Sequence, residues 1–483
     1  CECVFRADAI VAISSFTPRL HTSHTDTKIR AMSLTERAAA SGHDLDSIDF
    51  AKSMDAADDL KEFRSEFHMP LHSDGTEQVY LTGNSLGLQP KSTAAAVTAE
   101  LQKWAAIGVG GHFTGDLPWA QCEEKLPELL GEVVGAEDSE LEVAAMNTLT
   151  VNLHMLMAAF YRPSGERSTI IIEAGAFPSD RYAVASQLAH HGVPADRLVE
   201  VGAAGEVLAT ADVVAAIEAN HERLALVLLG GVNYLTGQVF DMGAIAAAVH
   251  RLNAAAPDRP PVILGYDLAH AVGNVPLRLH EWGVDFAAWC SYKYLNAGAG
   301  CIAGMFVHSK HATDFDAHPR LAGWWGVPFG KRFVMAHGFE PAAGAPGFAV
   351  SNVNPLLVAC AREALRVLKR AGGVAACRRK SLLLTAYLAA LIERRGLCAA
   401  ADGRCAVQIV TPADADARGC QLSLRVVAAN KSMRELEGLL AEQGCITDAR
   451  EPDIVRASPA PLYNSFEDVY KFVGVLADCL AKM

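Results

Sequence analysis

Short apolar runs alternate with amphipathic segments through the middle of the chain. The apolar runs occupy residues 169–172, 224–229, 262–266, 284–290 and 302–307. Between them, residues 211–223 and 242–252 repeat apolar side chains at helical spacing. Strands that are apolar on both faces and alternate with helices are typical of parallel sheets covered on both sides. We therefore predict an α/β fold with a mostly parallel sheet.

The pattern changes after residue 354. Helical spacing is found in residues 356–371, 380–395, 433–443 and 465–481, whereas residues 405–410 and 421–426 resemble strands. We therefore predict a smaller C-terminal α+β domain over residues 355–483. Residues 46–354 would combine N-terminal helices, one of them over 45–67, with the large domain.

Residues 1–45 lack sustained periodicity and begin with Cys rather than Met. The apolar run at residues 9–13 is short for the hydrophobic region of a secretory signal. We predict that this segment is an extension that is disordered or derived from cloning, with a targeting peptide as the alternative.

The composition narrows the class of protein and its partners. Hydrophobic residues make up 51% of the chain and charged residues 20%, which is typical of a folded protein with a large core. The net charge of -13 provides no basic surface for nucleic acid or an anionic membrane. No apolar run reaches the ~18 to 20 residues that cross a bilayer, and the 12 cysteines contain no C-x-x-C pair. We expect a soluble, cytoplasmic protein that acts on small molecules.

Lys293 and Asp267 carry the strongest chemical signal. Lys293 follows the apolar run at 284–290, and Asp267 ends the run at 262–266, with His270 shortly after it. An aldehyde cofactor such as pyridoxal 5'-phosphate (PLP) needs a lysine amine for a Schiff base and a carboxylate that keeps its pyridine nitrogen protonated. Burial would lower the pKa of the amine, and a buried carboxylate is costly without a partner. A lysine alone is more often a solvated surface residue, so the pairing with Asp267 favours a PLP site.

Other polar residues also follow predicted strands. Thr148 and Thr150 lie at the start of an apolar helix over residues 151–160, where backbone N–H groups could bind phosphate, and simple N-capping is equally consistent. Phe177 could lie against a cofactor ring. Asp180 could support the pyridine nitrogen, although helix capping is favoured when its segment is considered alone.

Tyr292 and Tyr294 flank Lys293. In a continuous strand both tyrosines would point away from the lysine. A tyrosine therefore shares the lysine's pocket only if the chain turns there.

Two motifs compete with this interpretation. Residues 83–87 fit G-x-S-x-G, the nucleophile elbow of serine hydrolases, with Ser85 as the nucleophile. An elbow joins a strand directly to a helix, whereas the next predicted helix begins later here, so we disfavour it. The glycines at 298–300 precede a strand-like run and not the helix of a dinucleotide site. His308 and His311 have no metal-ligating companions nearby, so we expect them to be solvated and predict no metal site.

These segments together resemble the kynureninase family of fold-type I PLP-dependent enzymes. The resemblance covers residues 45–483, and its most specific parts are residues 81–90, 147–154, 177–180, 265–273, 289–300 and 461–466. It implies a mostly parallel sheet of seven strands in a large domain, a smaller C-terminal domain, and a homodimer with shared active sites. It also implies hydrolysis of L-kynurenine or 3-hydroxy-L-kynurenine to anthranilate or 3-hydroxyanthranilate plus L-alanine, in tryptophan catabolism and NAD biosynthesis.

The resemblance implies roles for individual residues. Lys293 would form the Schiff base and Asp267 would support the pyridine nitrogen, and our candidate proton relay is Tyr292. The implied substrate-binding residues are Ser85, His112, Asn352 and Arg456, the last holding the α-carboxylate. The implied cofactor-binding residues are Leu149, Thr150, Phe177, Pro178, Ser179, Asp180, Asp267, His270, Tyr292, Lys293, Trp324 and Asn352. The last two of these would serve the active site of the neighbouring subunit.

A few positions bear on substrate preference. His112 and the Ser351–Asn352 pair resemble the eukaryotic form of the family, which favours the 3-hydroxylated substrate. Val327 stands where relatives commonly carry histidine, so the aryl end of the pocket would be less polar. Gly230 stands where a hydroxyl residue is common. These departures would change turnover or preference rather than cofactor attachment.

Three alternatives remain open at this point. Another PLP enzyme of the cysteine desulfurase and aminotransferase group would release a different product. A serine hydrolase would use Ser85 and be colourless. A non-catalytic binding protein would hold no cofactor and would tolerate substitution of Lys293.

Overall fold

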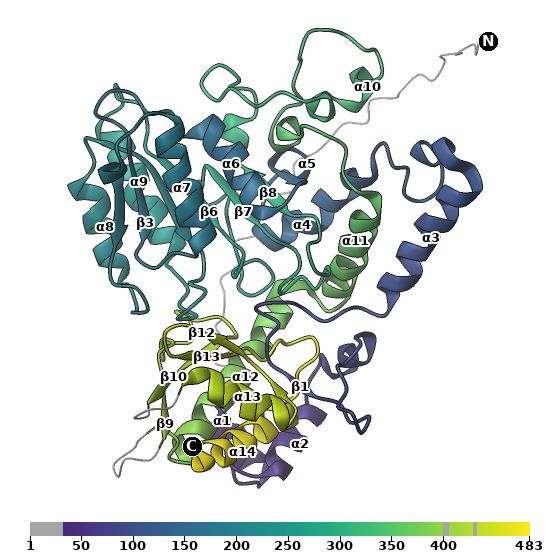
Figure 1. The fold of residues 1–483 in the computed structure, drawn as a ribbon, viewed down its shortest axis with the longest axis vertical. Helices are drawn as coiled ribbons and strands as arrows, with labels where there is room; N and C mark the ends of the chain where they lie inside the picture. Colours follow the sequence, from purple (N-terminus) through teal and green to yellow (C-terminus); the bar gives the residue numbers. More distant parts are fainter. Residues whose placement is uncertain (1–31, 399–404, 428–431) are drawn as a thin grey trace.

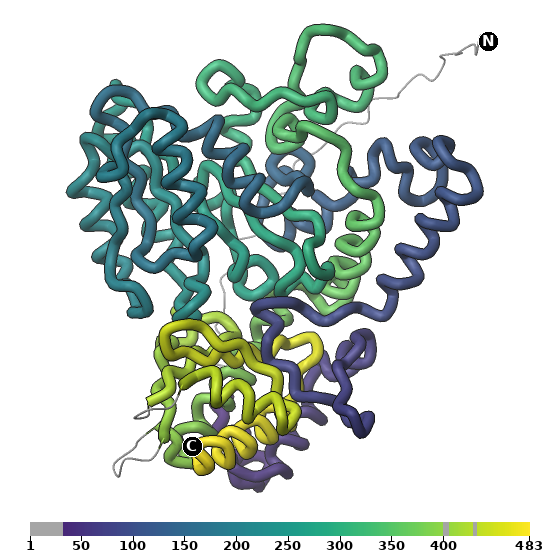
Figure 2. Tube along the Cα trace, viewed as in Figure 1, coloured from purple at the N-terminus to yellow at the C-terminus, as the bar shows by residue number. Residues whose placement is uncertain are grey.

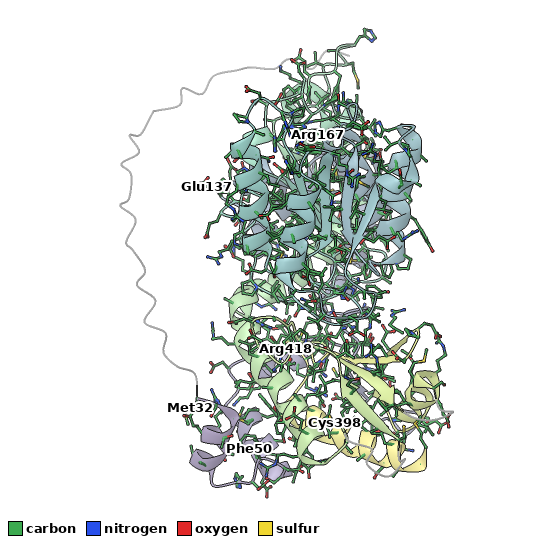
Figure 3. All side chains as sticks on the ribbon, turned by 90° about the vertical axis from the view of Figure 1, so that its left-hand side faces the viewer. Met32, Phe50, Glu137, Arg167, Cys398 and Arg418 are labelled. Atoms are coloured by element: carbon green, nitrogen blue, oxygen red, sulfur yellow. The ribbon has the colours of Figure 1, made fainter. Side chains whose placement is uncertain are left out.

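The computed structural model describes residues 32–398, 405–427 and 432–483, which form two bodies. In Figure 1 the upper body is teal and green, and in the lower one the yellow C-terminal elements lie beside purple N-terminal ones. Figure 3, turned by 90°, shows Arg167 and Glu137 on the upper body and Phe50 and Cys398 on the lower. Each body has a buried hydrophobic core.

The upper body contains a sheet of seven strands in the order β2-β8-β7-β6-β5-β3-β4. The strands are β2 (Val143–Ala145), β3 (Thr169–Glu173), β4 (Leu198–Val201), β5 (Leu224–Gly230), β6 (Ile263–Asp267), β7 (Phe286–Trp289) and β8 (Gly304–Val307). All neighbouring pairs from β4 to β7 are parallel, whereas β8 runs antiparallel to both of its neighbours. The prediction of an α/β fold with a mostly parallel sheet is confirmed.

Helices pack against this sheet, so that β3, β6, β7 and β8 are buried along their whole length. The helices of the upper body include α4 (Leu126–Val134), α6 (Leu149–Phe160), α7 (Pro178–His190), α8 (Thr210–Ala219), α9 (Met242–Ala255) and α11 (Pro355–Arg370). Local chemistry fixes their starts. Asp241 accepts the Ala244 N–H at 2.9 Å before α9, and Pro355 opens α11 after Asn354.

The lower body contains a four-stranded antiparallel sheet in the order β12-β13-β10-β9. Its elements are β9 (Ala406–Ile409), β10 (Leu422–Val427), β12 (Asp448–Arg450), β13 (Ile454–Ala457), α12 (Gly373–Arg394), α13 (Met433–Glu442) and α14 (Phe466–Lys482). The short strand β1 (Val79–Tyr80) pairs with β11 (Cys445–Ile446). This pairing brings the segment after β1 to the junction between the bodies.

The N-terminal helices pack with the C-terminal part of the chain. The core that holds Leu388 and Phe472 also contains Phe50 of α2 (Ile48–Ala56) and Ala38 of α1 (Leu34–Ser41). Figure 2 shows the purple tube of these helices against the yellow C-terminal tube. The predicted division had instead grouped the residues after 45 with the large domain.

Two further segments differ from the sequence-based expectations. Helix α1 lies inside the extension predicted for residues 1–45, because Ser33 and Glu36 form a capping box that stabilises its first turn. Helix α11 was expected to belong to the C-terminal domain, but it packs in the upper core. The predicted domain boundary at residue 355 itself stays a prediction. Residues 1–31 lie outside the described part of the chain. Among the described residues, no helix is both long and apolar enough to span a bilayer.

Candidate active site

A cavity of about 280 Å³ opens at the carboxyl ends of the parallel strands, where the two bodies meet. Glu173 ends β3, Gly230 ends β5 and Asp267 ends β6, and each of them lines the cavity. The predicted site residues that line it are Ser85, Leu149, Thr150, Phe177, Ser179, Asp180, Asp267, His270, Tyr292, Lys293 and Arg456. Residues far apart in the sequence are thus brought together by the strand order of the sheet.

Lys293 is held inside this cavity by His270. The chain leaves β7 at Trp289 and turns, so Tyr292 and Lys293 both face the cavity, whereas Tyr294 is buried and contacts Ser458 at 3.1 Å. The Lys293 Nζ lies 2.8 Å from His270 Nε2. Burial lowers the pKa of Lys293, and burial together with the lysine's charge lowers the pKa of His270 well below its usual value. The neutral imidazole accepts a hydrogen bond from the amine.

Carboxylates of Glu173, Asp180 and Asp267 gather on one side of the lysine. Asp267 accepts the Ala269 N–H at 2.7 Å, and Glu173 accepts the Gly230 N–H at 3.2 Å. Burial and then the charge of Asp267 raise the pKa of Asp180 well above its usual value, and burial raises the pKa of Glu173 to about 7. The Asp180 Oδ1 is buried without a hydrogen-bond partner among the described residues. A protonated ring nitrogen would satisfy this group of acids.

Two helices start at the same cavity. Helix α6 begins after Thr148, whose side chain makes no capping hydrogen bond, and α7 begins after Phe177. The hydroxyls of Thr150 and Ser179, one from each helix, lie 2.8 Å apart. Because helix N-termini present free N–H groups and positive partial charge, this pair of ends suits a phosphate.

The capping alternative holds in position for Thr148, whereas Thr150 and Asp180 do not stand at an N-cap position. Thr148 stands at the N-cap position of α6 without using its side chain, and Thr150 contacts Ser179 instead. Asp180 lies within the first turn of α7 and is buried beside Asp267 rather than bonded to a backbone N–H. Capping was a poor prediction for Asp180 because a carboxylate in the first turn of a helix can point into the protein. There it contacts Asp267 of another element.

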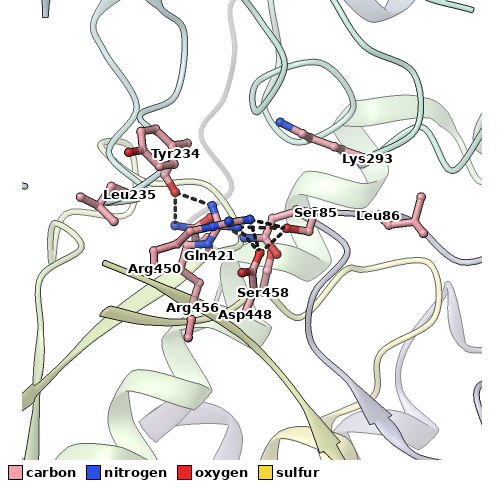
Figure 4. Close-up of polar contacts among 12 residues, drawn as sticks. Ser85, Leu86, Tyr234, Leu235, Lys293, Gln421, Asp448, Arg450, Arg456 and Ser458 are labelled. Atoms are coloured by element: carbon pink, nitrogen blue, oxygen red, sulfur yellow. Dashed lines mark hydrogen bonds and ion pairs between the residues drawn. The ribbon is translucent and has the colours of Figure 1, made fainter. Parts of the chain in front are cut away.

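The floor of the cavity comes from the lower body. Arg456 is 1% exposed, and its guanidinium donates to the Tyr234 carbonyl at 2.7 Å and to Ser85 Oγ at 3.1 Å. Asp448, which stands opposite Arg456 across the β12–β13 pair, accepts hydrogen bonds from both Arg456 and Arg450. Figure 4 shows this cluster below Lys293.

The serine hydrolase interpretation is wrong. Ser85 Oγ contacts Asp448, Arg450 and Arg456, and its hydrogen bonds within the described residues include no histidine. The turn at 83–87 also does not join a strand directly to a helix, since α3 (Ser92–Ile107) begins later. The Asp448 carboxylate that accepts the serine proton is a weak base, because Arg456 and Arg450 hold its pKa below the usual value, so it cannot activate Ser85.

Several predicted site residues lie outside the cavity of a single chain. Trp324 is 47% exposed and donates its indole N–H to the Arg332 carbonyl at 2.7 Å. Asn352 is exposed, and His112 is half-buried against Trp119. Pro178 opens α7 beside Phe177 without lining the cavity. Their assignment as site residues stays a prediction. For Trp324 and Asn352, the predicted site is that of a second subunit.

Gly230 and Val327, the two positions that differ from the residues common in relatives, lie in different surroundings. Gly230 lines the cavity, and a Cβ atom there would stand 3.0 Å from a Glu173 carboxylate oxygen. A side chain at this position would therefore press on Glu173. Val327 lines a separate cavity of about 320 Å³ with Trp325 and Phe329. In a single chain it does not contact the site.

The histidines expected to be solvated are instead half-buried and paired. His311 lies 2.8 Å from Asp285, and the rings of His308 and His280 are 4.5 Å apart. Glu142 and these last two histidines form a group with metal-ligand chemistry. Hydrogen bonds already engage the Glu142 carboxylate, which accepts the Ser309 and Glu137 N–H groups and faces His280 at 2.7 Å.

Sequence reasoning missed Glu173, Tyr234, Asp448 and Arg450, all of which lie in or next to the cavity. Glu173 could have been found, because it ends an apolar run just as Asp267 does. Asp448 and Arg450 lie in a short polar segment whose neighbours are set by strand pairing. Nothing in their local sequence indicates that they lie next to a cavity at the carboxyl ends of the strands of the upper body.

Solved structures share this fold over most of the chain. A C-DES mutant with glycine covalently linked to its PLP cofactor matches with a TM-score of 0.68 and 18% identity, covering 86% of this chain and 99% of that one. An apo cysteine desulfurase from Thermococcus onnurineus matches with a TM-score of 0.68 and 15% identity, covering 88% and 98%. The chain therefore has the α/β fold of these proteins, and a half-buried lysine lies in its cavity with carboxylates and two helix starts.

Relatives found by sequence similarity identify the family. Kynureninases from Koribacter versatilis and Xanthomonas oryzae are 46% and 48% identical, covering 88% and 89% of this chain and 96% and 98% of theirs. A model of the kynureninase C-terminal domain matches residues 377–476. The chain belongs to the kynureninase family.

Proposed function

We propose that the protein hydrolyses L-kynurenine or 3-hydroxy-L-kynurenine to L-alanine and anthranilate or 3-hydroxyanthranilate, in tryptophan catabolism and NAD biosynthesis. The observation that carries this proposal is one cavity lined by both a half-buried lysine, Lys293, and a fully buried arginine, Arg456. Such a cavity can hold an amino acid between a reactive amine and a carboxylate-binding guanidinium.

The residues of the cavity fit PLP. Asp267 and Asp180 would hold its pyridine nitrogen, Thr150 and Ser179 its phosphate, and Phe177 its ring. When bound, PLP attaches to the lysine amine and withdraws electrons from the α-carbon of the substrate. The unpartnered Asp180 oxygen supports the first of these contacts, since a cationic N–H donor would satisfy it.

Lys293 would remove the α-proton once the substrate amine has replaced it. Burial lowers the pKa of its amine, so a larger fraction of the amine is free to accept a proton. His270, at 2.8 Å and uncharged, can hold the amine in place without competing for the proton. The lysine is thereby both the attachment point and the general base.

Tyr292 would supply a proton to the substrate carbonyl or to the departing β-carbon. Burial raises the pKa of its hydroxyl, so the group stays protonated and can donate. Its ring lies beside the lysine, with the Lys293 Nζ 6.0 Å from the ring centroid. The bond between the β-carbon and the carbonyl carbon would break after water has added to the carbonyl.

Arg456 would bind the substrate α-carboxylate. Its guanidinium is fixed by the Tyr234 carbonyl, Ser85 and Asp448, so little ordering is needed when substrate binds. This cation fixes one end of the amino acid while Lys293 acts at the α-carbon.

Incubation with L-kynurenine, 3-hydroxy-L-kynurenine and L-cysteine tests the reaction. The PLP-loaded protein should release a fluorescent anthranilate and alanine from a kynurenine. Sulfur release from cysteine without any product from the kynurenines would contradict the proposal. The ratio of kcat/KM for the two kynurenines tests the preference for the 3-hydroxylated substrate, which is proposed on the resemblance at His112 and Asn352.

We also propose a homodimer in which Trp324 and Asn352 complete the partner's site. Large apolar side chains are exposed on α3 and on the segment before α11, and ring contacts at 5.5 Å and 5.6 Å join Phe113, Phe333 and Trp324 there. Such exposed apolar surface is typical of interaction sites. Mixing Lys293→Ala and Trp324→Ala subunits should restore activity above either variant alone, and no gain in verified mixed dimers would contradict shared sites.

A cytoplasmic location is proposed on the state of the cysteines. Cys290, Cys301 and Cys420 are buried thiols. Thiols are kept reduced in the cytosol. Fractionation of source cells with a kynureninase activity assay tests this, and activity confined to an organelle fraction would contradict it.

A further inference from the structure

A second arginine stands beside Arg456 at the floor of the cavity. Asp448 and Arg450 alternate with Ala449 along β12, so their side chains leave the same face of the strand. Arg456 on β13 pairs directly with Asp448 and therefore shares this face. The strand register thus places two guanidinium groups on either side of one carboxylate.

The same acceptors hold both guanidinium groups. The Arg450 Nη2 lies 2.9 Å from Asp448 Oδ2 and 3.2 Å from Ser85 Oγ. Arg456 Nη2 donates to these same two atoms. Figure 4 shows the shared contacts. The side chains are therefore fixed side by side before any ligand arrives.

Each guanidinium keeps an unused donor. The Nε atoms of Arg450 and Arg456 are both buried without a hydrogen-bond partner among the described residues. An unsatisfied buried donor is costly, so the protein's own acceptors do not fully satisfy either guanidinium group. Both residues line the cavity, and the Arg450 side chain is 40% exposed, so its terminal N–H groups can meet an acceptor there.

The charges of the cluster also favour an anion. Two arginines and one aspartate leave a single positive charge in excess at the floor of the cavity. A ligand carboxylate would neutralise this excess and supply two oxygens that accept hydrogen bonds from guanidinium groups. An amide or an ester would supply no charge.

We propose that Arg450 is a second substrate-binding residue, which binds the α-carboxylate of the substrate together with Arg456. This inference rests on the proposed function, since it names the part of kynurenine that the floor of the cavity recognises. The two guanidinium groups, linked through Asp448 and Ser85, act as one clamp. They select amino acids with a free carboxylate over their amides.

The variant Arg450→Gln tests the clamp in the PLP-loaded enzyme. Loss of one charge-assisted hydrogen bond, at ~1.5 to 3 kcal/mol, corresponds to a rise of about 10- to 100-fold in KM for kynurenine. The value of kcat should change much less. The inhibition constant of kynurenine α-carboxamide should stay unchanged, because this analogue has no carboxylate. Arg450→Lys, which keeps the charge, should recover part of the loss.

A matched control lies in the same sheet, two strands away from Arg450. Arg425 of β10 pairs with Glu206 and Asp453 and does not line the cavity, so Arg425→Gln should leave every constant unchanged. A KM for Arg450→Gln within twofold of wild type would overturn the inference, as would an equal rise in the carboxamide constant. Failure of the wild type to hydrolyse kynurenine would instead remove the proposed function. The clamp would then be tested by the dissociation constants of kynurenine and its carboxamide. Arg450→Gln should raise the constant for kynurenine alone, and an equal effect on both would overturn the inference.

Discussion

Replacement of Glu173 by glutamine should stabilise the apoprotein at alkaline pH. Burial raises the pKa of Glu173 to about 7 from its usual 4.5. At ~1.4 kcal/mol for each pH unit of difference, ionised Glu173 costs the folded protein about 3 kcal/mol. Glutamine has the same shape, and its amide oxygen can still accept the Gly230 N–H. The variant removes this cost without opening a cavity.

The sign of the effect depends on pH. Below about pH 4.5 the carboxyl group is protonated in both the folded and the unfolded chain, so Glu173→Gln should change little. Between pH 4.5 and 7 the unfolded chain loses its proton first, and the wild-type protein loses stability relative to the variant. Above pH 7 the variant should be more stable by the full difference of about 3 kcal/mol.

Urea unfolding of PLP-free protein at pH 5 and pH 8 measures this difference. The free energy of unfolding of Glu173→Gln minus that of wild type should be several-fold larger at pH 8 than at pH 5. Exposed Glu222→Gln serves as the control and should show no such change. Equal differences at both pH values would refute the reasoning that Glu173 is a buried acid held beside Asp267.

The remaining predictions concern the lysine, its carboxylate partner and the fold. Lys293→Ala should abolish turnover and the visible absorption band of the bound cofactor, and normal activity would refute its assignment. Asp267→Ala should weaken PLP binding by about 10-fold or more in an absorbance titration and lose most activity, since a charge-assisted hydrogen bond is worth ~1.5 to 3 kcal/mol; wild-type kinetics would count against its role. Asp58→Asn should destabilise the protein by about 3 kcal/mol in urea unfolding, because Lys380 would lose its buried partner at 2.7 Å, and an unchanged midpoint would contradict this.

Much of the fold could be predicted because its strands are buried on both faces. Continuous apolar runs marked β3, β5, β6, β7 and β8, whereas β2 and β4 were missed. β4 is only partly buried and contains Glu200, and β2 has three residues, so neither gives a clear pattern. The helix expected over 45–67 is divided into α2 and a 3-10 helix (Lys61–Glu66). Its boundaries depend on packing that a local pattern does not contain.

The site residues could be predicted where they end an apolar strand or follow it closely in the sequence. Lys293 and Asp267 were identified in this way, and both line the cavity. Asp448 and Arg450 were not, because their relation to Arg456 arises from an antiparallel pairing between strands. The packing of α1 and α2 on the C-terminal body was missed for the same reason, since contacts between distant segments leave no local signal.

The attachment of the cofactor to Lys293 is the most direct test of the account. The purified protein, incubated with PLP, should absorb in the visible range, and borohydride reduction should fix the cofactor to the protein. Mass spectrometry of the digested protein should then find the pyridoxyl group on the peptide that contains Lys293. A protein that binds no PLP, or that carries the group on another lysine, would contradict the account.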